Sequence, residues 1–240
     1  MCGRAGSGTG NAVVPPSDNQ PMSKPRLATP HRILPWLLPL ECACCRGTVE
    51  APGGSGALCR SCARERQPAP PLPVPDGLVA CLAPYAYDGV VKHEILSMKA
   101  TGRFGGIPTM ARAMYDVLRP LLQPETLITW APTSKRRAQR RGFDQAEELG
   151  RAIAGHSGFV AARALSRVSI REQQGAGRAA RAEVGFTARA LFPVGEWPAV
   201  VIVDDVRTTG ATFGAAARAI RDKGGEKIIG IAYAATPQRR

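Results

Sequence analysis

Two adjacent carboxylates, Asp204 and Asp205, follow the apolar run Val-Val-Ile-Val at 200–203. Four β-branched apolar residues in a row predict a strand buried on both faces, as in a parallel sheet covered by helices, and we expect it to stop at the acids. Open α/β sheets bind their ligands at the carboxyl ends of such strands. Paired acids there suit hydrogen bonding to the two hydroxyls of a ribose, or holding a hydrated Mg²⁺.

The turn after the acids has the chemistry of an anion site. It is rich in hydroxyls and leads into residues 211–223, whose alanines and spaced apolar residues predict a helix. Free N–H groups at a helix start attract a phosphate, and the helix dipole adds to the attraction. The simpler alternative is a buried strand whose acids cap the next helix. The residues expected around a ligand here are Val206, Arg207, Thr208, Thr209, Gly210, Ala211 and Thr212.

Four cysteines have the spacing of metal ligands. Cys42 and Cys45 form one C-x-x-C pair, Cys59 and Cys62 form another, and a glycine-containing loop joins the pairs. This spacing predicts four thiolates around one tetrahedral Zn²⁺, and the metal would supply folding energy that so short a segment lacks. The alternatives are a redox pair or scattered free thiols, and Cys44 could compete as a ligand.

Composition limits the classes of partner. The 240 residues can hold one α/β domain and a small appendage. A net charge of +13 predicts attraction to polyanions, either nucleic acid or a highly phosphorylated small molecule, although 5% aromatic residues offer few stacking platforms for single strands. No apolar run is long enough to predict a membrane span. Seven cysteines without a clear secretory signal predict a reducing, cytoplasmic location.

We expect four parts in chain order. Residues 1–30, rich in Gly, Pro and Ser, predict a disordered tail, within which Met22 could be the true start. Residues 31–66 hold an apolar, proline-containing segment and the four cysteines. Residues 67–76 predict a stiff proline-rich linker. Residues 77–238 predict the main domain, a central, mostly parallel sheet flanked by helices.

A second buried strand is predicted over 127–132, and five basic residues follow within 135–141. Gly142-Phe143-Asp144-Gln145 then opens a helix. A basic cluster of this kind is either a solvated face or part of a diphosphate site. The other expected elements are a strand pair over 77–87, helices over 90–100 and 108–118, strands over 163–168 and 227–234, and a long loop over 169–181.

Taken in order, these motifs resemble the ComF family of competence-associated proteins within the type I phosphoribosyltransferases. The resemblance rests on the strand, two acids and Thr-Thr-Gly-x-Thr at 200–212, on the clustered basics before Arg-Gly-Phe-Asp-Gln at 141–145, and on the four-cysteine module. It covers residues 33–237. The chain departs from the family pattern at Asp144, where Asn is commoner, and near Val184, where an expected Asn is missing.

The resemblance implies a phosphoribosyltransferase fold that binds phosphoribosyl pyrophosphate (PRPP). It also implies Mg²⁺-dependent transfer of phosphoribose to an unidentified acceptor, with release of pyrophosphate, in a DNA-uptake context. Asp204 and Asp205 would be the catalytic acids at the ribose hydroxyls and metal, and 208–212 would enclose the 5-phosphate. Two alternatives stay open, a non-catalytic PRPP-responsive protein that binds single-stranded DNA with the uptake machinery, and an inert scaffold. The remaining candidate substrate-binding residues are Ala131, Pro132, Thr133, Ser134, Arg137, Arg141, Lys99, Gln174 and Arg181.

Overall fold

A computed structural model describes residues 41–49, 58–101, 105–131, 133, 142–167, 188–191 and 194–237 of the 240-residue chain. All described residues belong to one compact unit, 39–240. The predicted tail, the apolar segment before the cysteines and the predicted loop over 169–181 lie outside the described residues. Within the described part of the chain, no helix is long and apolar enough to cross a membrane.

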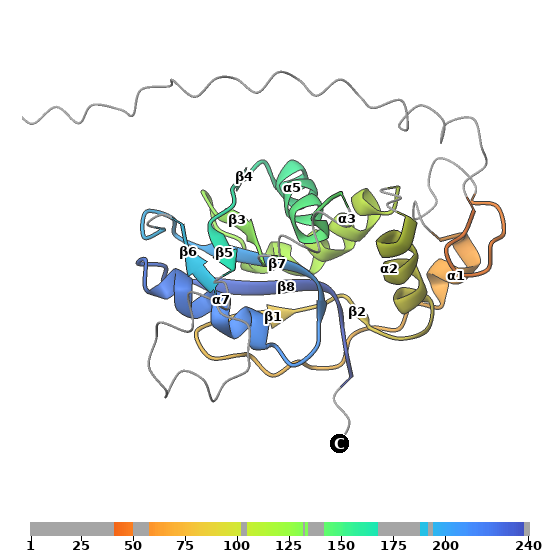
Figure 1. Ribbon diagram of the computed structural model, residues 1–240, viewed down its shortest axis with the longest axis horizontal. Helices are drawn as coiled ribbons and strands as arrows, with labels where there is room; N and C mark the ends of the chain where they lie inside the picture. Colours follow the sequence, from red (N-terminus) through yellow and green to blue (C-terminus); the bar gives the residue numbers. More distant parts are fainter. Residues whose placement is uncertain are drawn as a thin grey trace, which may run out of the picture. The chain divides into compact units, whose positions relative to one another are not determined.

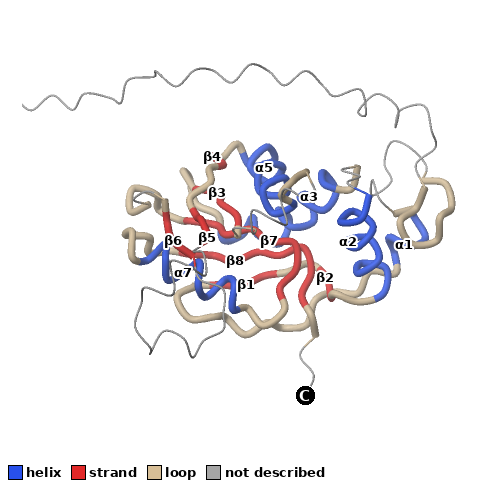
Figure 2. Tube along the Cα trace, viewed as in Figure 1, coloured by secondary structure: helices blue, strands red, loops and turns tan. Residues whose placement is uncertain are grey.

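A six-stranded sheet with parallel pairing forms the centre of the fold (Figures 1 and 2). Its order is β1-β8-β7-β3-β4, and β2 also pairs with β8, while β5 and β6 form a separate antiparallel pair. The strands are β1 Ala80–Leu82, β2 Tyr85–Ala86, β3 Leu127–Trp130, β4 Val160–Ala161, β5 Leu165–Arg167, β6 Ala188–Ala190, β7 Val200–Arg207 and β8 Ile228–Ala235. The predicted parallel sheet is therefore confirmed.

Helices cover both faces of this sheet, as predicted (Figure 1). The helices are α1 Arg60–Arg64, α2 Gly89–Thr101, α3 Ile107–Leu118, α5 Gln145–Ser157 and α7 Ala211–Arg221, with a 3-10 turn, η3, at Arg119–Leu121. In α3 the buried residues recur at helical spacing and give the helix one apolar face. α3 and α5 pack on one face of the sheet with α2 in the same apolar cluster, and α7 packs on the other.

Alternate side chains of β7 point into two separate cores. Val201 and Val203 join the apolar cluster of α3 and α5, whereas Val200 and Ile202 join the cluster that contains Phe213 of α7. Because successive strand residues face opposite sides of a sheet, a strand covered on both sides must be apolar throughout. This requirement explains the uninterrupted apolar run in the sequence.

The chain reverses its direction of winding between β3 and β7. It passes from β3 through α5 to β4 on one side, and from β7 through α7 to β8 on the other. β3 and β7 pair from Leu127 with Val200 to Trp130 with Val203. Two neighbouring parallel strands whose following helices lie on opposite faces leave a crevice beyond their carboxyl ends. The residues that follow these two strands are therefore brought to one edge of the sheet.

Two details differ from the sequence predictions. β7 does not stop at the acids but continues to Arg207, because β8 offers eight residues of backbone for pairing whereas β3 offers four and ends at Trp130. The two short strands within 77–87 do not pair with each other, since β1 and β2 each pair with β8. In both cases the length and position of β8 decide the outcome.

Candidate functional site

The acid pair lies immediately beyond the end of the β3–β7 ladder. Oδ2 of Asp205 is 2.6 Å from Nζ of Lys99, which reaches the site from α2. The backbone N–H of Asp205 donates to Oδ1 of Asp204 at 2.8 Å. Burial, followed by the charge of Asp205, raises the pKa of Asp204 well above its ordinary value, while the backbone N–H and Lys99 oppose that rise. The two acids thus already share one protein cation.

The loop after β7 presents hydroxyls at the start of α7. Thr208 and Thr209 are exposed and Thr212 is partly exposed. Gly210 is the N-cap of α7 with a φ of 87°, a conformation that glycine adopts without strain, and it offers no side-chain cap. Such a helix start leaves N–H groups of its first turn for another acceptor, although the N–H of Ala211 donates to Oγ1 of Thr209 at 3.3 Å. Hydroxyls and N–H groups together suit an anion.

Arg207, a predicted ligand-binding residue, is buried and lies against the same loop. Its Nη2 donates to the carbonyl oxygen of Pro73 at 2.9 Å. A Cβ added to Gly210 would lie 2.9 Å from Cγ of Pro75 and 3.3 Å from Nη2 of Arg207. The proline-rich segment, predicted only as a linker, therefore also packs against the glycine of the loop.

On the neighbouring strand, Ala131 and Thr133 follow β3. The N–H of Ala131 donates to the carbonyl oxygen of Val203 at 2.8 Å. Oγ1 of Thr133 donates to Oδ1 of Asp144 at 3.1 Å, and the same oxygen accepts from the N–H of Ala146 at 3.2 Å as the N-cap of α5. Asp144 therefore holds Thr133. The sequence signal for this role was its N-cap position, not its departure from the family pattern.

The structure brings part of the predicted set together. Lys99, Asp204 and Asp205 meet directly. Residues 208–212, which we call the threonine loop, follow the acids in the chain and lead into α7, and Ala131 and Thr133 follow the neighbouring strand β3. The other predicted side chains lie outside the described residues, and they are Pro132, Ser134, Arg137, Arg141, Gln174 and Arg181.

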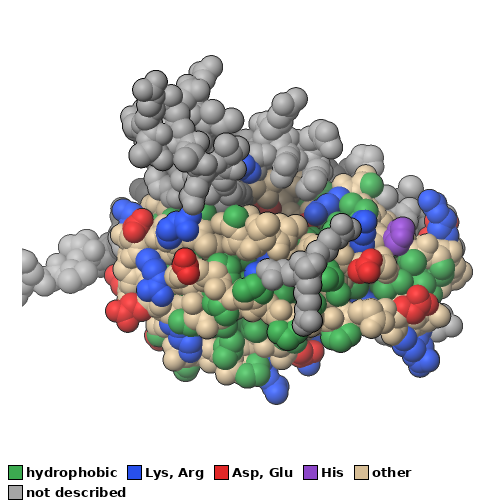
Figure 3. Space-filling view, turned by 90° about the horizontal axis from the view of Figure 1, so that it is seen from below, with side chains coloured by type: hydrophobic (Ala, Val, Ile, Leu, Met, Phe, Trp, Pro, Cys, Tyr) green, Lys and Arg blue, Asp and Glu red, His purple; other side chains and the backbone are tan. Residues whose placement is uncertain are grey.

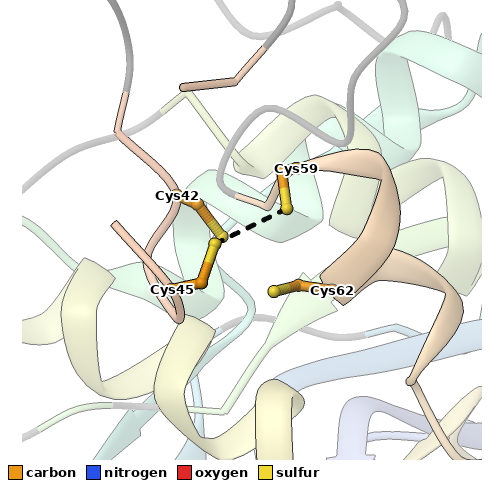
Figure 4. A group of neighbouring side chains, drawn as sticks. All are labelled: Cys42, Cys45, Cys59 and Cys62. Carbon is orange, nitrogen blue, oxygen red and sulfur yellow. Dashed lines mark hydrogen bonds between the residues drawn. The ribbon is translucent and has the colours of Figure 1, made fainter. Parts of the chain in front are cut away.

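The four predicted metal ligands converge (Figure 4). Their sulfurs all lie within 4.8 Å of one another, and the Sγ atoms of Cys45 and Cys59 are 3.7 Å apart. Zn–S bonds of about 2.3 Å in a tetrahedron place sulfurs about 3.8 Å apart, so the cluster fits Zn²⁺. Cys44, considered as a competing ligand, is not part of this group among the described residues. A structural metal site is thus supported by geometry.

The thiols of this cluster differ in acidity. Burial opposes ionisation of Cys42, but backbone N–H groups of Cys59, Cys45 and Cys44 outweigh it and lower the pKa of Cys42 to about 6. Burial and the neighbouring thiols raise the pKa of Cys62. Four thiolates this close together repel one another, so a cation is needed to hold them all ionised.

Sequence reasoning missed a buried ion pair that joins the cysteine segment, by which we mean the four cysteines and the chain up to Arg66, to α2 and the sheet. Nη2 of Arg66 lies 2.8 Å from Oε1 of Glu94 on α2, and the hydroxyl of Tyr233 on β8 donates to Oε2 of Glu94 at 2.7 Å. Burial raises the pKa of Glu94, while Arg66 and Tyr233 oppose the rise. The three residues come from distant segments, so no local pattern could reveal them.

No family model matches the chain, and no curated protein sequence matches it. Among solved structures, the chain is similar to the purine phosphoribosyltransferase from Pyrococcus horikoshii Ot3, with 18% identity and a TM-score of 0.30. The similarity covers 52% of this chain and 70% of that chain.

Proposed function

We propose that this chain is a PRPP-binding protein of the type I phosphoribosyltransferase kind, related to the ComF family. The observation that carries the proposal is the meeting of Asp204, Asp205 and Lys99 at the carboxyl end of β7, directly before the threonine loop. Acids beside an anion-binding helix start match a ligand that carries ribose hydroxyls and a phosphate. A cytoplasmic location and a part in DNA uptake belong to the same proposal.

Three groups of residues bind different parts of the ligand. The threonine loop binds the 5-phosphate through hydroxyls and N–H groups. Asp204 and Asp205 accept hydrogen bonds from the ribose hydroxyls, and the loop after β3, which contains Thr133, meets the pyrophosphate. The two carboxylates are also a donor set that fits Mg²⁺, which when bound would neutralise pyrophosphate charge. Lys99 supplies the counter-charge of Asp205 in the ligand-free chain.

The reaction needs positioning more than reactive side chains. The C1–O bond to pyrophosphate breaks and its electron pair leaves with the pyrophosphate, while the acceptor forms a bond to C1 and its proton passes to water. The developing positive charge on the ribose is stabilised by the carboxylates of Asp204 and Asp205. Because the loop fixes the ribose through its phosphate, no side chain must act as a nucleophile.

Ligand binding tests the proposal directly. Thermal unfolding and calorimetric titration with PRPP and Mg²⁺ should show binding to the wild-type chain, worth about 2.7 kcal/mol of stabilisation at about 100 times the dissociation constant. Replacing both acids, Asp204→Asn with Asp205→Asn, should remove it. The matched control is Asp116→Asn, which removes an acid from an exposed i,i+4 ion pair on α3 and should leave PRPP binding unchanged. A wild-type chain that PRPP does not stabilise would contradict the proposal and favour the inert scaffold.

Turnover is tested separately from binding. Pyrophosphate release from PRPP is followed while a panel of nucleobases is offered as acceptors. Release that depends on an acceptor and is lost in the double Asn variant supports transfer. PRPP binding without release from any acceptor favours the non-catalytic, PRPP-responsive alternative.

The proposed DNA partner rests on the net charge of +13. On the face seen in Figure 3, the described Lys and Arg side chains are interspersed with Asp and Glu, so this face is not a uniformly basic surface. Fluorescence anisotropy with single-stranded DNA should show affinity that falls steeply as salt rises, because each neutralised phosphate releases counterions. Failure to bind at low salt would remove DNA as a partner and leave the PRPP proposal in place.

A further inference from the structure

Arg207 buries a guanidinium that no acid of the described chain neutralises. The residue is 2% exposed, and its Nη2 donates to the carbonyl oxygen of Pro73 at 2.9 Å. Among the described residues, Nε and Nη1 have no hydrogen-bond partner, and no carboxylate lies within ion-pair distance. Buried charges are normally paired, and buried polar atoms are normally hydrogen-bonded. The guanidinium of Arg207 departs from this pattern among the described residues.

A titratable neighbour, Cys81 of β1, does not supply the missing negative charge. Burial raises the pKa of the Cys81 thiol, and this outweighs the charge of Arg207 and a side-chain hydrogen bond with it, which both favour the thiolate. The thiol consequently stays neutral near pH 7. Among the described residues, the positive charge of Arg207 is therefore left without a negative partner.

This charge lies beside the start of α7. A Cβ on Gly210 would be 3.3 Å from Nη2 and 3.4 Å from Nε of Arg207. Gly210 is the N-cap of α7, where N–H groups of the first turn and the helix dipole already favour an anion. The buried charge and the helix start therefore act on the same loop. Water screens a buried charge little, so its field reaches across the loop.

We propose that Arg207 is a specificity-determining residue, whose uncompensated charge makes the loop select a ligand that carries a phosphate group. The inference rests on the proposed function and deepens it. The phosphate brings the negative charge that the guanidinium lacks, and Arg207 acts through the intervening loop without having to touch the ligand. Binding thus compensates a charge that no acid among the described residues pairs.

A purely structural role makes a different prediction. If Arg207 only ties the proline-rich segment to the loop through Pro73, its removal should destabilise the ligand-free chain and should have no selective effect on phosphate. If its charge awaits an anion, its removal should leave the ligand-free chain equally stable or more stable, because apolar groups often replace buried charges without loss.

Arg207→Met removes the charge while keeping a long side chain. Calorimetric titrations with ribose 5-phosphate and, in parallel, with inorganic phosphate should show affinity reduced by about tenfold or more for both ligands. If the affinity falls for ribose 5-phosphate but not for inorganic phosphate, Arg207 selects a phosphate ester and not the free ion. The thermal unfolding temperature without ligand should be unchanged or higher. Arg207→Lys keeps the charge and should keep ribose 5-phosphate affinity within about threefold.

Arg221→Gln provides a matched control. Nε of Arg221 donates to the carbonyl oxygen of Gly77, directly after the proline-rich segment, at 2.9 Å, but Arg221 is exposed at the far end of α7. The variant should bind ribose 5-phosphate as the wild type does.

Two results would overturn the inference. One is an Arg207→Met variant that binds ribose 5-phosphate as tightly as the wild type. The other is a variant that fails to fold or unfolds at a clearly lower temperature, since Arg207 is then a structural tie. A wild-type chain that binds neither ribose 5-phosphate nor PRPP refutes the proposed function, and this inference with it. The two kinds of failure are distinguished by the wild-type titration.

Discussion

At the scale of single residues, Asp144 ties together two neighbouring pieces of the site. Its Oδ1 accepts from the hydroxyl of Thr133 after β3 and from the N–H of Ala146 at the start of α5. Burial raises the pKa of Asp144, and the hydroxyl of Thr133 is the strongest of the groups that oppose the rise. The carboxylate is thus useful as an acceptor but costly to keep ionised.

Asp144→Asn keeps the acceptor and the cap without the charge. Because the folded pKa of Asp144 is raised, its contribution to stability is fully present below the ordinary carboxyl pKa and is lost as pH rises through the folded value. The unfolding free energy of the wild type should therefore fall relative to the Asn variant from about pH 4 toward neutrality. Asp144→Ala should cost about 1 kcal/mol through loss of the cap. Urea unfolding across this pH range measures both effects. A wild type whose free energy of unfolding rises relative to that of the Asn variant as pH increases would contradict the raised pKa of Asp144.

At the scale of elements, local sequence pattern predicted most of the sheet and its helices. The four β-branched residues of 200–203 marked β7, and the apolar spacing of 108–118 marked α3, because each pattern reports the burial of its own segment. The paired acids and the threonines could be assigned to the end of this strand because they directly follow its apolar run in the sequence.

Contacts between distant segments could not be predicted in this way. The length of β7 depends on β8, and the Pro73–Arg207 hydrogen bond depends on how the proline-rich segment folds over the loop. Lys99 meets Asp205 because α2 happens to end beside β7, and a lysine within a helix gives no sign of such a partner. The sequence therefore named the acids, the loop and the cations Lys99 and Arg207 as candidate site residues, but it did not predict which groups these cations contact.

A substitution at Gly230 of β8 tests how closely α7 packs on the sheet. A Cβ there would lie 2.8 Å from Cδ2 of Leu78 and 3.0 Å from Cδ1 of Phe213, and both side chains are buried. Gly230→Ala should therefore cost about 1–3 kcal/mol through overpacking. Gly155, in α5, has open space around its Cβ position, so Gly155→Ala should add up to about 1 kcal/mol of helix stability. Chemical denaturation compares the two variants, and equal effects would argue against tight packing at Gly230.

At the scale of the described molecule, α2 contacts both functional regions. Near its middle, Glu94 pairs with Arg66 of the cysteine segment, and near its end, Lys99 pairs with Asp205. Cys42 and Cys62 also belong to the apolar cluster that contains Ile95 of α2. The thiol cluster and the acid pair are therefore connected to two different parts of one helix, its middle and its C-terminal end.

Loss of the metal should consequently loosen α2 and not only the cysteine segment. Cys45→Ser removes one thiolate and should reduce zinc from about one ion per chain to near none, lowering the free energy of unfolding by more than about 2 kcal/mol, because metal binding orders segments that lack a core. Cys44→Ser is the matched control and should keep its zinc, since Cys44 is not among the four converging sulfurs. Elemental analysis measures the metal, and hydrogen exchange compares α2 with β3 and β7. Exchange that rises in α2 before it rises in these strands would show that the cysteine segment supports the helix carrying Lys99, whereas unchanged protection of α2 in a zinc-free chain would show that it does not.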